Sequence, residues 1–458
     1  MAAGMCPERL QRVTALTRGY VDSGRMPCAD VLVARHNKLL LRDTYGDLNV
    51  ESRTPLPEDA LFRIYSMTKP LTCIAGMICY ERGFFAMDDP VGLHLPEFAN
   101  LSVLVGGGKP PPGPEEASEL MATPLPENCP LTIGHLFTHT NGLSRAPGGP
   151  APTSLAESVQ QVAASPLLFL PGTQWKYSGG HDVVARLVEV WTGCSYEEFL
   201  RSEVLKPLRM HGTTFRVPLA QRHRLVTPYS YTQTAGNAVA PGLLFETTTQ
   251  DVYAEGDSED RVCVGAVTNT AGFPAPSGGL VSTMADYSKF AHMLLNGGEL
   301  EGGGRLLGRK TVQQIATNYL PIAAGCQAPD GSPWFRTPDC GVLGAASDLP
   351  TPGHSNTNGG PGIGFGVGGM AVVSDTSLVP YPCSDGEIYW VGAASTHFWV
   401  DRAEGLVVIF FSQLLPWTQY NYMRELRIAV SQALIDDDCG RALTLSATVS
   451  SPGPQPRL

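Results

Sequence analysis

The order of strand-like and helix-like segments constrains the fold of this chain more than any other feature of its sequence. Apolar runs typical of strands occur near the start, at 31–35 and 39–45, and again near the end, at 396–400 and 406–412. Helical patterns occupy the middle of the chain. This order predicts an α/β fold whose sheet is completed by N- and C-terminal pieces, with a helical insertion between them.

Apolar residues recur at helical spacing in many segments of the chain. We expect helices at 8–22, 66–82, 131–138, 154–164, 180–192, 195–203, 284–296, 309–317 and 419–435. Stretches in which Gly and Pro are frequent lie at about 101–127, 218–275 and 320–370. They predict loops, and long loops of this kind often form the rim of a functional site.

The composition indicates a globular protein, since 43% of the 458 residues are hydrophobic and 16% are charged. The net charge is -11 and no cluster of Lys and Arg occurs, so we expect neither nucleic acid nor an anionic membrane as the main partner. No apolar run has the length of a signal peptide or a membrane span, which favours the cytoplasm. The terminal Pro456-Arg457-Leu458 loosely resembles a peroxisomal tripeptide, and that compartment is the alternative.

Cysteine and histidine spacings give little sign of a disulfide framework or a metal site. The eleven cysteines are odd in number, scattered, and never spaced Cys-x-x-Cys. His135 and His139 have the spacing that places two imidazoles on one helical face, but Leu136 stands where a His-Glu-x-x-His site has its glutamate. We therefore expect no metal and no other cofactor.

Ser66-Met-Thr-Lys69 stands at the start of a predicted helix. Residues three apart share one helical face, so the amine of Lys69 can reach the hydroxyl of Ser66. The first turn of a helix also offers free N–H groups and the positive end of the dipole, which suit an anionic tetrahedral intermediate. By itself, however, this spacing is more often a helix N-cap serine followed by a solvated lysine.

Further segments resemble the serine β-lactamase-like family, in the order in which that family has them. They are Phe62-Arg-Ile-Tyr-Ser-Met-Thr-Lys-Pro-Leu71, Leu131-Thr-Ile-Gly-His-Leu-Phe-Thr-His-Thr-Asn-Gly-Leu143, Pro171-Gly-Thr-Gln-Trp-Lys-Tyr-Ser178, Ser277-Gly-Gly-Leu-Val-Ser-Thr-Met-Ala-Asp286 and Phe398-Trp-Val-Asp401. The resemblance covers most of the chain. Its nearest branches are similar to the class C β-lactamase-related esterases and the lovastatin-type acyltransferases.

This resemblance implies a β-lactamase/transpeptidase-like fold, with an antiparallel sheet flanked by helices. We expect a single catalytic unit over residues 1–445. Its α/β part would be about 1–65 and 310–445, and its helical part about 66–309. Residues 446–458 would be a disordered tail.

Carried over residue by residue, Ser66 resembles the family's nucleophile, Lys69 sits beside it, and Tyr177 fills the position of the tyrosine base. The chemistry is coherent, because a serine hydroxyl needs a neighbouring base. Burial lowers the pKa of a lysine, and neighbouring positive charge lowers that of a tyrosine, so either group can serve. Without the family context, Tyr177 would be an ordinary packed aromatic at the start of a helix.

The family's third motif lies on a strand that borders the site, and Trp390-Val-Gly392 is the candidate here. Gly392 would let this strand approach the substrate without a side-chain clash. The backbone N–H of Ala393 would then form an oxyanion hole with that of Ser66. The match is short, and an ordinary central strand that contains a glycine is the alternative.

Other polar and glycine-rich features are expected to be structural. The ring nitrogens of His135 and His139 would hold neighbouring backbone, and Asp286 is typical of a helix terminus or a salt bridge. The glycine-rich run 359–369 lacks the Gly-Lys-Ser/Thr ending of a phosphate loop, and we interpret it as a turn-rich strand flank.

Two departures from the lactamase pattern bear on the substrate. Gly179 stands where the family's Tyr-x-Asn has the asparagine that contacts a substrate amide, and Trp390 stands where a cation grips the carboxylate of a β-lactam. Both favour an ester or thioester acyl donor. We therefore predict a serine hydrolase that acts on a small-molecule ester through an acyl-enzyme, or an acyltransferase of the same chemistry. A β-lactamase or D-alanyl peptidase, and a catalytically silent scaffold or filament protein, are the alternatives.

Overall fold

The computed structural model describes residues 2–104, 122–144, 152–231, 244–246, 261–263, 273–320 and 362–435. Several sequence predictions lie outside these ranges. They are the glycine and proline runs within 106–113, most of the stretches 218–275 and 320–370, and the predicted tail over 446–458.

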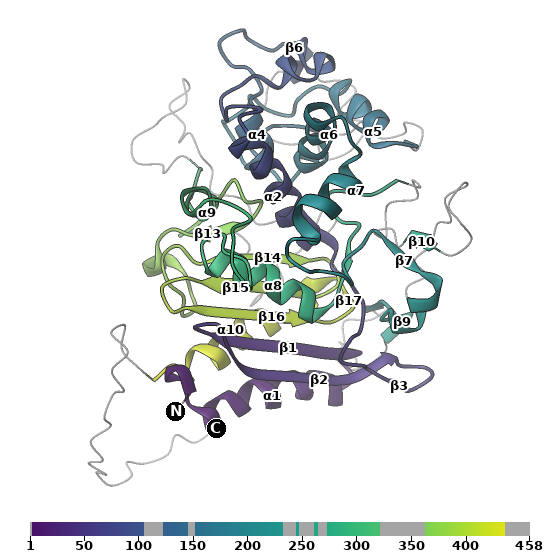
Figure 1. Ribbon diagram of the computed structural model, residues 1–458, viewed down its shortest axis with the longest axis vertical. Helices are drawn as coiled ribbons and strands as arrows, with labels where there is room; N and C mark the ends of the chain where they lie inside the picture. The colour runs from purple at the N-terminus through teal and green to yellow at the C-terminus, as the bar shows by residue number, and fades with distance from the viewer. Residues whose placement is uncertain are drawn as a thin grey trace, which may run out of the picture.

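One eight-stranded sheet joins the two ends of the chain (Figure 1), in the order β12-β13-β14-β15-β16-β1-β2-β3. The strands are β1 Cys28–Arg35, β2 Lys38–Asn49, β3 Thr54–Pro55, β12 Ile363–Phe365, β13 Ala371–Val373, β14 Ile388–Gly392, β15 Thr396–Asp401 and β16 Leu406–Phe411. All of these neighbours pair antiparallel. β1 and β16 join the two groups, from Asp30 opposite Phe411 to Arg35 opposite Leu406. The predicted sheet is confirmed.

Helices cover both faces of this sheet (Figure 1). α1 (Pro7–Asp22) and α10 (Tyr422–Ser431) pack together on one face, and α8 (Met284–Leu295) packs on the other. Neighbouring strand residues point to opposite faces. Accordingly, the Phe410 ring lies 5.0 Å from that of Tyr422 in α10, and the Phe411 ring lies 6.0 Å from that of Tyr287 in α8. β16, which is apolar at every position, is thus buried on both sides.

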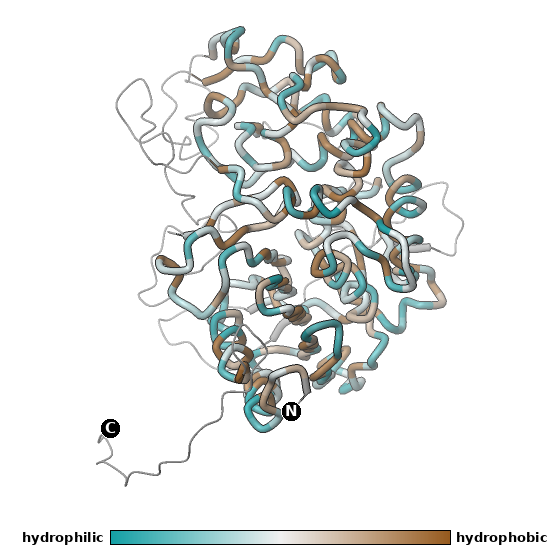
Figure 2. The backbone as a smooth tube through the Cα atoms, turned by 60° about the vertical axis from the view of Figure 1, so that its left-hand side comes forward, coloured by the Kyte–Doolittle hydropathy of each residue, from teal (hydrophilic) through white to brown (hydrophobic). Residues whose placement is uncertain are grey.

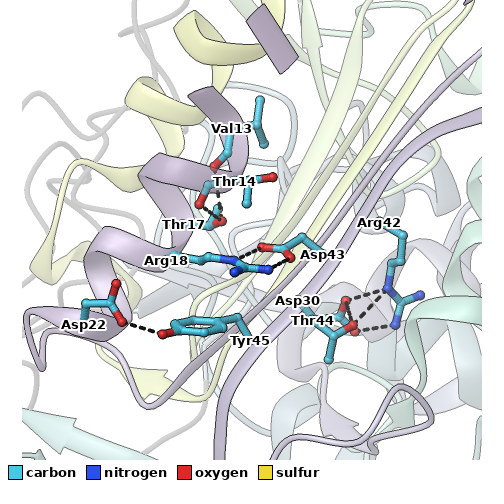
Figure 3. A network of polar contacts seen from close by, with 10 residues as sticks. All are labelled: Val13, Thr14, Thr17, Arg18, Asp22, Asp30, Arg42, Asp43, Thr44 and Tyr45. Carbon is cyan, nitrogen blue, oxygen red and sulfur yellow. Dashed lines mark hydrogen bonds and ion pairs between the residues drawn. The ribbon is translucent and has the colours of Figure 1, made fainter. Parts of the chain in front are cut away.

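Polar contacts fasten α1 to the outer strands of the sheet (Figure 3). Arg18 of α1 donates to both carboxylate oxygens of Asp43 in β2, at 2.6 and 3.0 Å. The next residue back, Arg42, points to the opposite face of β2. There it pairs with the buried carboxylate of Asp30 at 2.7 Å. One ion pair therefore ties the hairpin to α1, and the other joins the two strands of the hairpin on its opposite face.

The helices between the two strand groups form a second part of the molecule, at the top of Figure 1. They are α2 Thr68–Glu81, α4 Ile133–Phe137, α5 Leu155–Ala163, α6 Gly180–Thr192 and α7 Tyr196–Phe199, which continues as the π-helical segment η5 Leu200–Leu205. α2 is buried over most of its length and packs against α6. α9 (Arg309–Ile315) follows α8. Every helix expected from the sequence is present.

Two details differ from the sequence-based expectation. The predicted boundary at residue 309 assigns α8 to the helical part, whereas α8 packs on β15 and β16. The division of the chain into two parts otherwise stays a prediction. The predicted loop over 101–127 carries two short paired strands, β5 Ser102–Leu104 and β6 Ala122–Pro124.

Small sheets complete the structure. β4 Phe62–Arg63 pairs with β11 Val281–Ser282, β7 Arg216–Pro218 with β10 Arg261–Cys263, and β8 Tyr229–Tyr231 with both β9 Leu244–Glu246 and β17 Leu414–Leu415. β4, in the first of these pairs, lies shortly before Ser66 in the sequence. It therefore matters for the site described below.

Hydrophobic residues are spread along the whole described chain. Brown and teal segments alternate along the tube in Figure 2, and most of the buried hydrophobic side chains form one large cluster that runs through the sheet and the helices. Leu61, Val217 and Val281 form a second, small cluster. Within the described ranges, no helix combines the length and the hydropathy needed to cross a membrane.

A buried ion pair ties α10 to the sheet. Arg427 of α10 donates to the carboxylate of Glu387, which directly precedes β14, and the two side chains are only 4% and 2% exposed. The rings of Tyr381, Tyr389 and Trp399 surround the guanidinium group at 4.7 to 4.9 Å. Without Glu387, this guanidinium would have an aromatic cage but no counter-ion.

We predict that Glu387→Gln lowers the free energy of unfolding by about 3 kcal/mol, because a buried arginine would lose its counter-ion. The control is Glu198→Gln, which breaks an ion pair with Arg201 whose side chains are 50% and 63% exposed. That change should cost about 0.5 kcal/mol or less. Urea unfolding followed by circular dichroism measures both. Equal effects of the two substitutions would contradict the structural importance of the buried pair.

Candidate active site

Ser66 lies in η2 (Tyr65–Met67), a short 3₁₀ turn directly before α2. The turn is held on both sides. The backbone N–H of Ile64 donates to Leu280 O at 3.0 Å, and the Tyr287 hydroxyl of α8 donates to Met67 O at 3.0 Å. Because β4, β11 and α8 all anchor this turn, Ser66 has little freedom to move. The residue is 9% exposed.

The hydroxyl groups of Ser66 and Tyr177 are in direct contact, with 2.6 Å between the two oxygens. Lys69, in the first turn of α2, places its Nζ 3.5 Å from Ser66 Oγ and 4.4 Å from the centre of the Tyr177 ring. Tyr177 comes from the loop before α6, more than a hundred residues away in the sequence. The structure thus brings together the three residues that the sequence analysis singled out.

The Lys69 amine has a second partner that the sequence analysis did not identify. Its Nζ donates to the backbone carbonyl of Ser277 at 2.7 Å. Thr72, one turn further along α2, donates to Pro276 O at 2.7 Å. The backbone of residues 276–277 therefore accepts two hydrogen bonds from side chains of α2. Lys69, only 3% exposed, is therefore fixed between Ser66 and the 276–277 backbone.

Asp182, in the first turn of α6, contacts the same Ser277 through its side chain. Its carboxylate accepts from the Ser277 hydroxyl at 2.6 Å. Burial raises the pKa of Asp182, while the hydrogen bond from Ser277 and the positive charge of Lys69 oppose that rise. In the sequence, Asp182 is an ordinary acidic residue in the first turn of a helix. Nothing in the pattern around it indicates that it lies near Lys69.

Trp390 is fully buried and lies behind Tyr177. Its ring centre is 6.0 Å from that of Tyr177 and 5.3 Å from that of Phe365. The substrate-binding role expected of Trp390 stays a prediction. This ring supports Tyr177 from the side of the sheet.

Gly392 is required by packing within the protein. A Cβ at this position would lie 2.3 Å from Ile64 O and 2.2 Å from Thr396 Oγ1. The structure therefore shows that this glycine lets β14 approach the turn that holds Ser66; its role in the approach to a substrate stays a prediction. Ala393 follows at once, with its carbonyl accepting from Trp417 N at 3.0 Å. The oxyanion role of the Ala393 and Ser66 N–H groups stays a prediction.

Gly179 and Gly180 are both at the start of α6, but only the second is demanded by sterics. A Cβ on Gly179 would meet only Asp182 Oδ2, at an ordinary 3.4 Å, so the structure has room for a side chain there. A Cβ on Gly180 would lie 2.6 Å from Asn141 Nδ2 and 2.7 Å from Leu136 O. The missing asparagine at position 179 is therefore not a consequence of crowding.

The two histidines of the 131–143 segment hold backbone, as predicted. The Nδ1 atom of His135 accepts from the N–H of Thr132 at 3.1 Å, in a capping box of α4. The Nδ1 atom of His139 accepts from the N–H of Ser178 at 3.2 Å. No group of three or more His, Cys, Asp or Glu side chains that could hold a metal ion occurs among the described residues.

Asp286 and the glycine-rich run also take the structural places expected of them. Asp286, in the first turn of α8, accepts from Gly212 N at 2.7 Å and pairs with Lys289 at 3.1 Å. The described part of the run, from Gly362, forms β12 and its flanks.

A buried pair of imidazoles lies next to the site. His139 and His181 have ring centres 4.5 Å apart. Burial is the main cause that lowers the pKa of both, and Lys69 adds to it; for His181 the pKa falls to about 3. The Nε2 of His181 bonds to the carbonyl of Phe137 at 3.1 Å and must donate to it. Both rings are thus neutral at physiological pH.

Comparison with known proteins finds relatives over most of the chain. The Beta-lactamase family matches residues 13–433. The esterase EstB of Burkholderia gladioli is 28% identical over 443 residues, which cover 92% of this chain and 94% of the esterase. Monacolin J acid methylbutanoyltransferase of Aspergillus terreus is 26% identical over 410 residues, 83% of this chain and 86% of the transferase. The solved structure of EstCE1, described as a hydrolase with promiscuous acyltransferase activity, superposes with a TM-score of 0.67 at 22% identity, covering 93% of this chain and 99% of that one.

The buried histidines predict an acid-sensitive fold. The pKa of His181 is about 6.5 without the fold and about 3 within it, so below pH 6.5 the unfolded chain takes up a proton that the folded protein does not. Stability is therefore full above pH 6.5 and is lost as the pH falls towards 3.

We predict that His181→Gln, whose amide can still donate to Phe137 O, reduces the stability lost between pH 6 and pH 4 by about 2 kcal/mol. Urea unfolding at each pH measures this, and the exposed His223, replaced by Gln, is the control. An unchanged pH dependence in His181→Gln would show that this ring does not carry the effect.

Proposed function

Because this chain belongs to the beta-lactamase family, we propose that it is a serine hydrolase that cleaves a small-molecule ester or thioester through an acyl-enzyme on Ser66. The observation that supports this most strongly is the contact of Ser66 Oγ with the Tyr177 hydroxyl at 2.6 Å, with Lys69 Nζ 3.5 Å from the same oxygen. A nucleophilic serine needs such a base within hydrogen-bond reach.

The distances favour Tyr177 as the group that takes the proton. Ser66 Oγ attacks the acyl carbonyl carbon while its proton passes to the Tyr177 oxygen; collapse of the tetrahedral intermediate breaks the bond to the leaving group, which receives that proton. Lys69 holds its positive charge close to the Tyr177 ring, where it stabilises a phenolate. Water or an alcohol then attacks the acyl-enzyme and regenerates Ser66.

The developing oxyanion would be stabilised by backbone N–H groups. Gly392 packs against the carbonyl of Ile64, which brings the end of β14 beside the turn of Ser66. The N–H groups of Ser66 and Ala393, on these two segments, are the proposed donors. Such donors are typically worth about a hundredfold to a thousandfold in rate.

The substrate is proposed to be an ester or thioester, because the groups that would grip a β-lactam are missing. Position 179 has no side chain although the structure has space for one, and Trp390 offers no cation and is buried. The relatives named as an esterase and a methylbutanoyltransferase support an acyl donor of this class. Hydrolysis and acyl transfer share every step up to the acyl-enzyme and differ only in the acceptor.

A panel of p-nitrophenyl esters and acyl thioesters tests the proposed activity. We predict hydrolysis by the wild-type protein and its loss in Ser66→Ala, because the covalent route needs the hydroxyl. Adding an alcohol as a competing acceptor separates transfer from hydrolysis, since a transferase forms a new ester at the expense of the free acid. Equal activity of Ser66→Ala and wild type would remove Ser66 from the mechanism.

Lys69 and Tyr177 should behave as one unit. We predict that Lys69→Met and Tyr177→Phe each reduce the acylation rate by about a hundredfold or more. The double variant should be little worse than either single variant, because groups that act together are non-additive. Tyr45→Phe, which removes a hydroxyl that bonds only to Asp22 on the far side of the sheet (Figure 3), is the control and should keep the full rate.

Single-turnover measurements with an activated ester give the rates, and thermal melts check the fold. A Tyr177→Phe variant with normal acylation would transfer the role of the base to another group. Fully additive losses in the double variant would contradict the shared proton path.

A further inference from the structure

His139 is a fully buried residue that the chemistry proposed above does not use. It follows α4, with a backbone φ of +58°, a left-handed conformation that residues other than glycine adopt rarely. Its ring lies against Tyr177, with 4.8 Å between the ring centres. A conformation of this kind persists only where the surrounding structure holds it.

The residues before and after Tyr177 each donate their backbone N–H to this one residue. The N–H of Lys176, before Tyr177, donates to the backbone carbonyl of His139 at 2.9 Å. The N–H of Ser178, after Tyr177, donates to the ring Nδ1 of His139 at 3.2 Å. The left-handed φ at His139 lets its carbonyl and its ring reach the same short segment. Tyr177 is therefore clamped from both sides.

The bond from Ser178 also defines the state of the imidazole. Nδ1 can accept an N–H only when it carries no proton, so the ring is the neutral tautomer with its proton on Nε2. Burial, helped by His181 and Lys69, lowers the pKa of His139 well below its usual value, which keeps the ring in that state. The Ser178 hydroxyl donates elsewhere, to Asn141 Oδ1 at 3.0 Å.

We propose that His139 is a positioning residue, whose neutral imidazole and backbone carbonyl hold the Tyr177 hydroxyl within reach of Ser66. The proposal rests on the function proposed above, because it matters only if Tyr177 moves the Ser66 proton. A displacement of about 1 Å at a reacting group can cost about a hundredfold in rate. Loosening one side of the clamp should therefore lower kcat while leaving KM almost unchanged.

Two amide substitutions at His139 distinguish the effect of losing the acceptor for the Ser178 N–H from the effect of losing the imidazole ring. In His139→Asn the side-chain oxygen can stand close to the place of Nδ1, and asparagine tolerates the left-handed conformation. In His139→Gln the amide reaches further, towards the place of Nε2, and the Ser178 N–H loses its acceptor. We expect His139→Asn to keep kcat within about threefold of wild type and His139→Gln to lose about tenfold to a hundredfold.

A double-variant cycle with Tyr177→Phe distinguishes positioning from general support of the fold. If His139 acts through Tyr177, adding His139→Gln to Tyr177→Phe should lower the rate no further. Thermal melts of the same variants report any loss of stability separately. A structural role alone would reduce the rate by the same factor in both backgrounds.

Direct observation of the tautomer keeps the proposal testable should His139→Gln fail to fold. In wild-type protein with ¹⁵N-labelled histidine, the ring nitrogens of His139, assigned by their absence in His139→Asn, should show an unprotonated Nδ1 and a protonated Nε2 at the pH of activity. A proton on Nδ1 would overturn the proposal.

The kinetic outcomes also distinguish the proposed role of His139 from the proposed hydrolase mechanism on which it rests. Normal kcat in His139→Gln, or equal losses in His139→Asn and His139→Gln, would overturn the role of His139 and leave the proposed hydrolase intact. Normal kcat in Tyr177→Phe would overturn both.

Discussion

The pairing of β1 with β16 is the constraint on which the rest of the structure depends. It joins residues 30–35 to residues 406–411 and so makes one sheet from the two ends of the chain. α10 then packs against α1 across one face, while α8 covers the other and holds the turn of Ser66 through the Tyr287 hydroxyl. The helical part begins after β4, which pairs with β11 outside the eight-stranded sheet. The geometry at Ser66 therefore depends on contacts between segments far apart in sequence.

The site itself is assembled from backbone as much as from side chains. Lys69 binds the carbonyl of Ser277, Tyr177 is flanked by two N–H groups bonded to His139, and Gly392 rests on the carbonyl of Ile64. Backbone groups are kept in every substitution except one by proline, which removes the N–H, and they have few degrees of freedom. If Ser66 and Tyr177 act as proposed, this nucleophile and its base are organised in advance, which is the condition under which positioned groups accelerate a reaction most.

Local periodicity was enough to predict the helices and the principal strands, because amphipathic spacing and strand alternation are recorded in neighbouring residues. The candidate triad followed from motifs. What could not be predicted depends on packing between distant segments. The burial of Trp390 behind Tyr177 and the contact of Gly392 with Ile64 are of this kind. The hydrogen bond from Ser277 to Asp182 could not be predicted either, because acidic residues are common in the first turn of helices.

The central claim is that Ser66 is an activated nucleophile, and covalent labelling followed by peptide mapping tests it most directly. The protein is incubated with a fluorophosphonate probe, digested, and the modified residue located by tandem mass spectrometry. The account predicts one adduct, on Ser66, that forms more slowly in Tyr177→Phe. An adduct on a different residue, or a wild-type protein that takes up no probe, would contradict it.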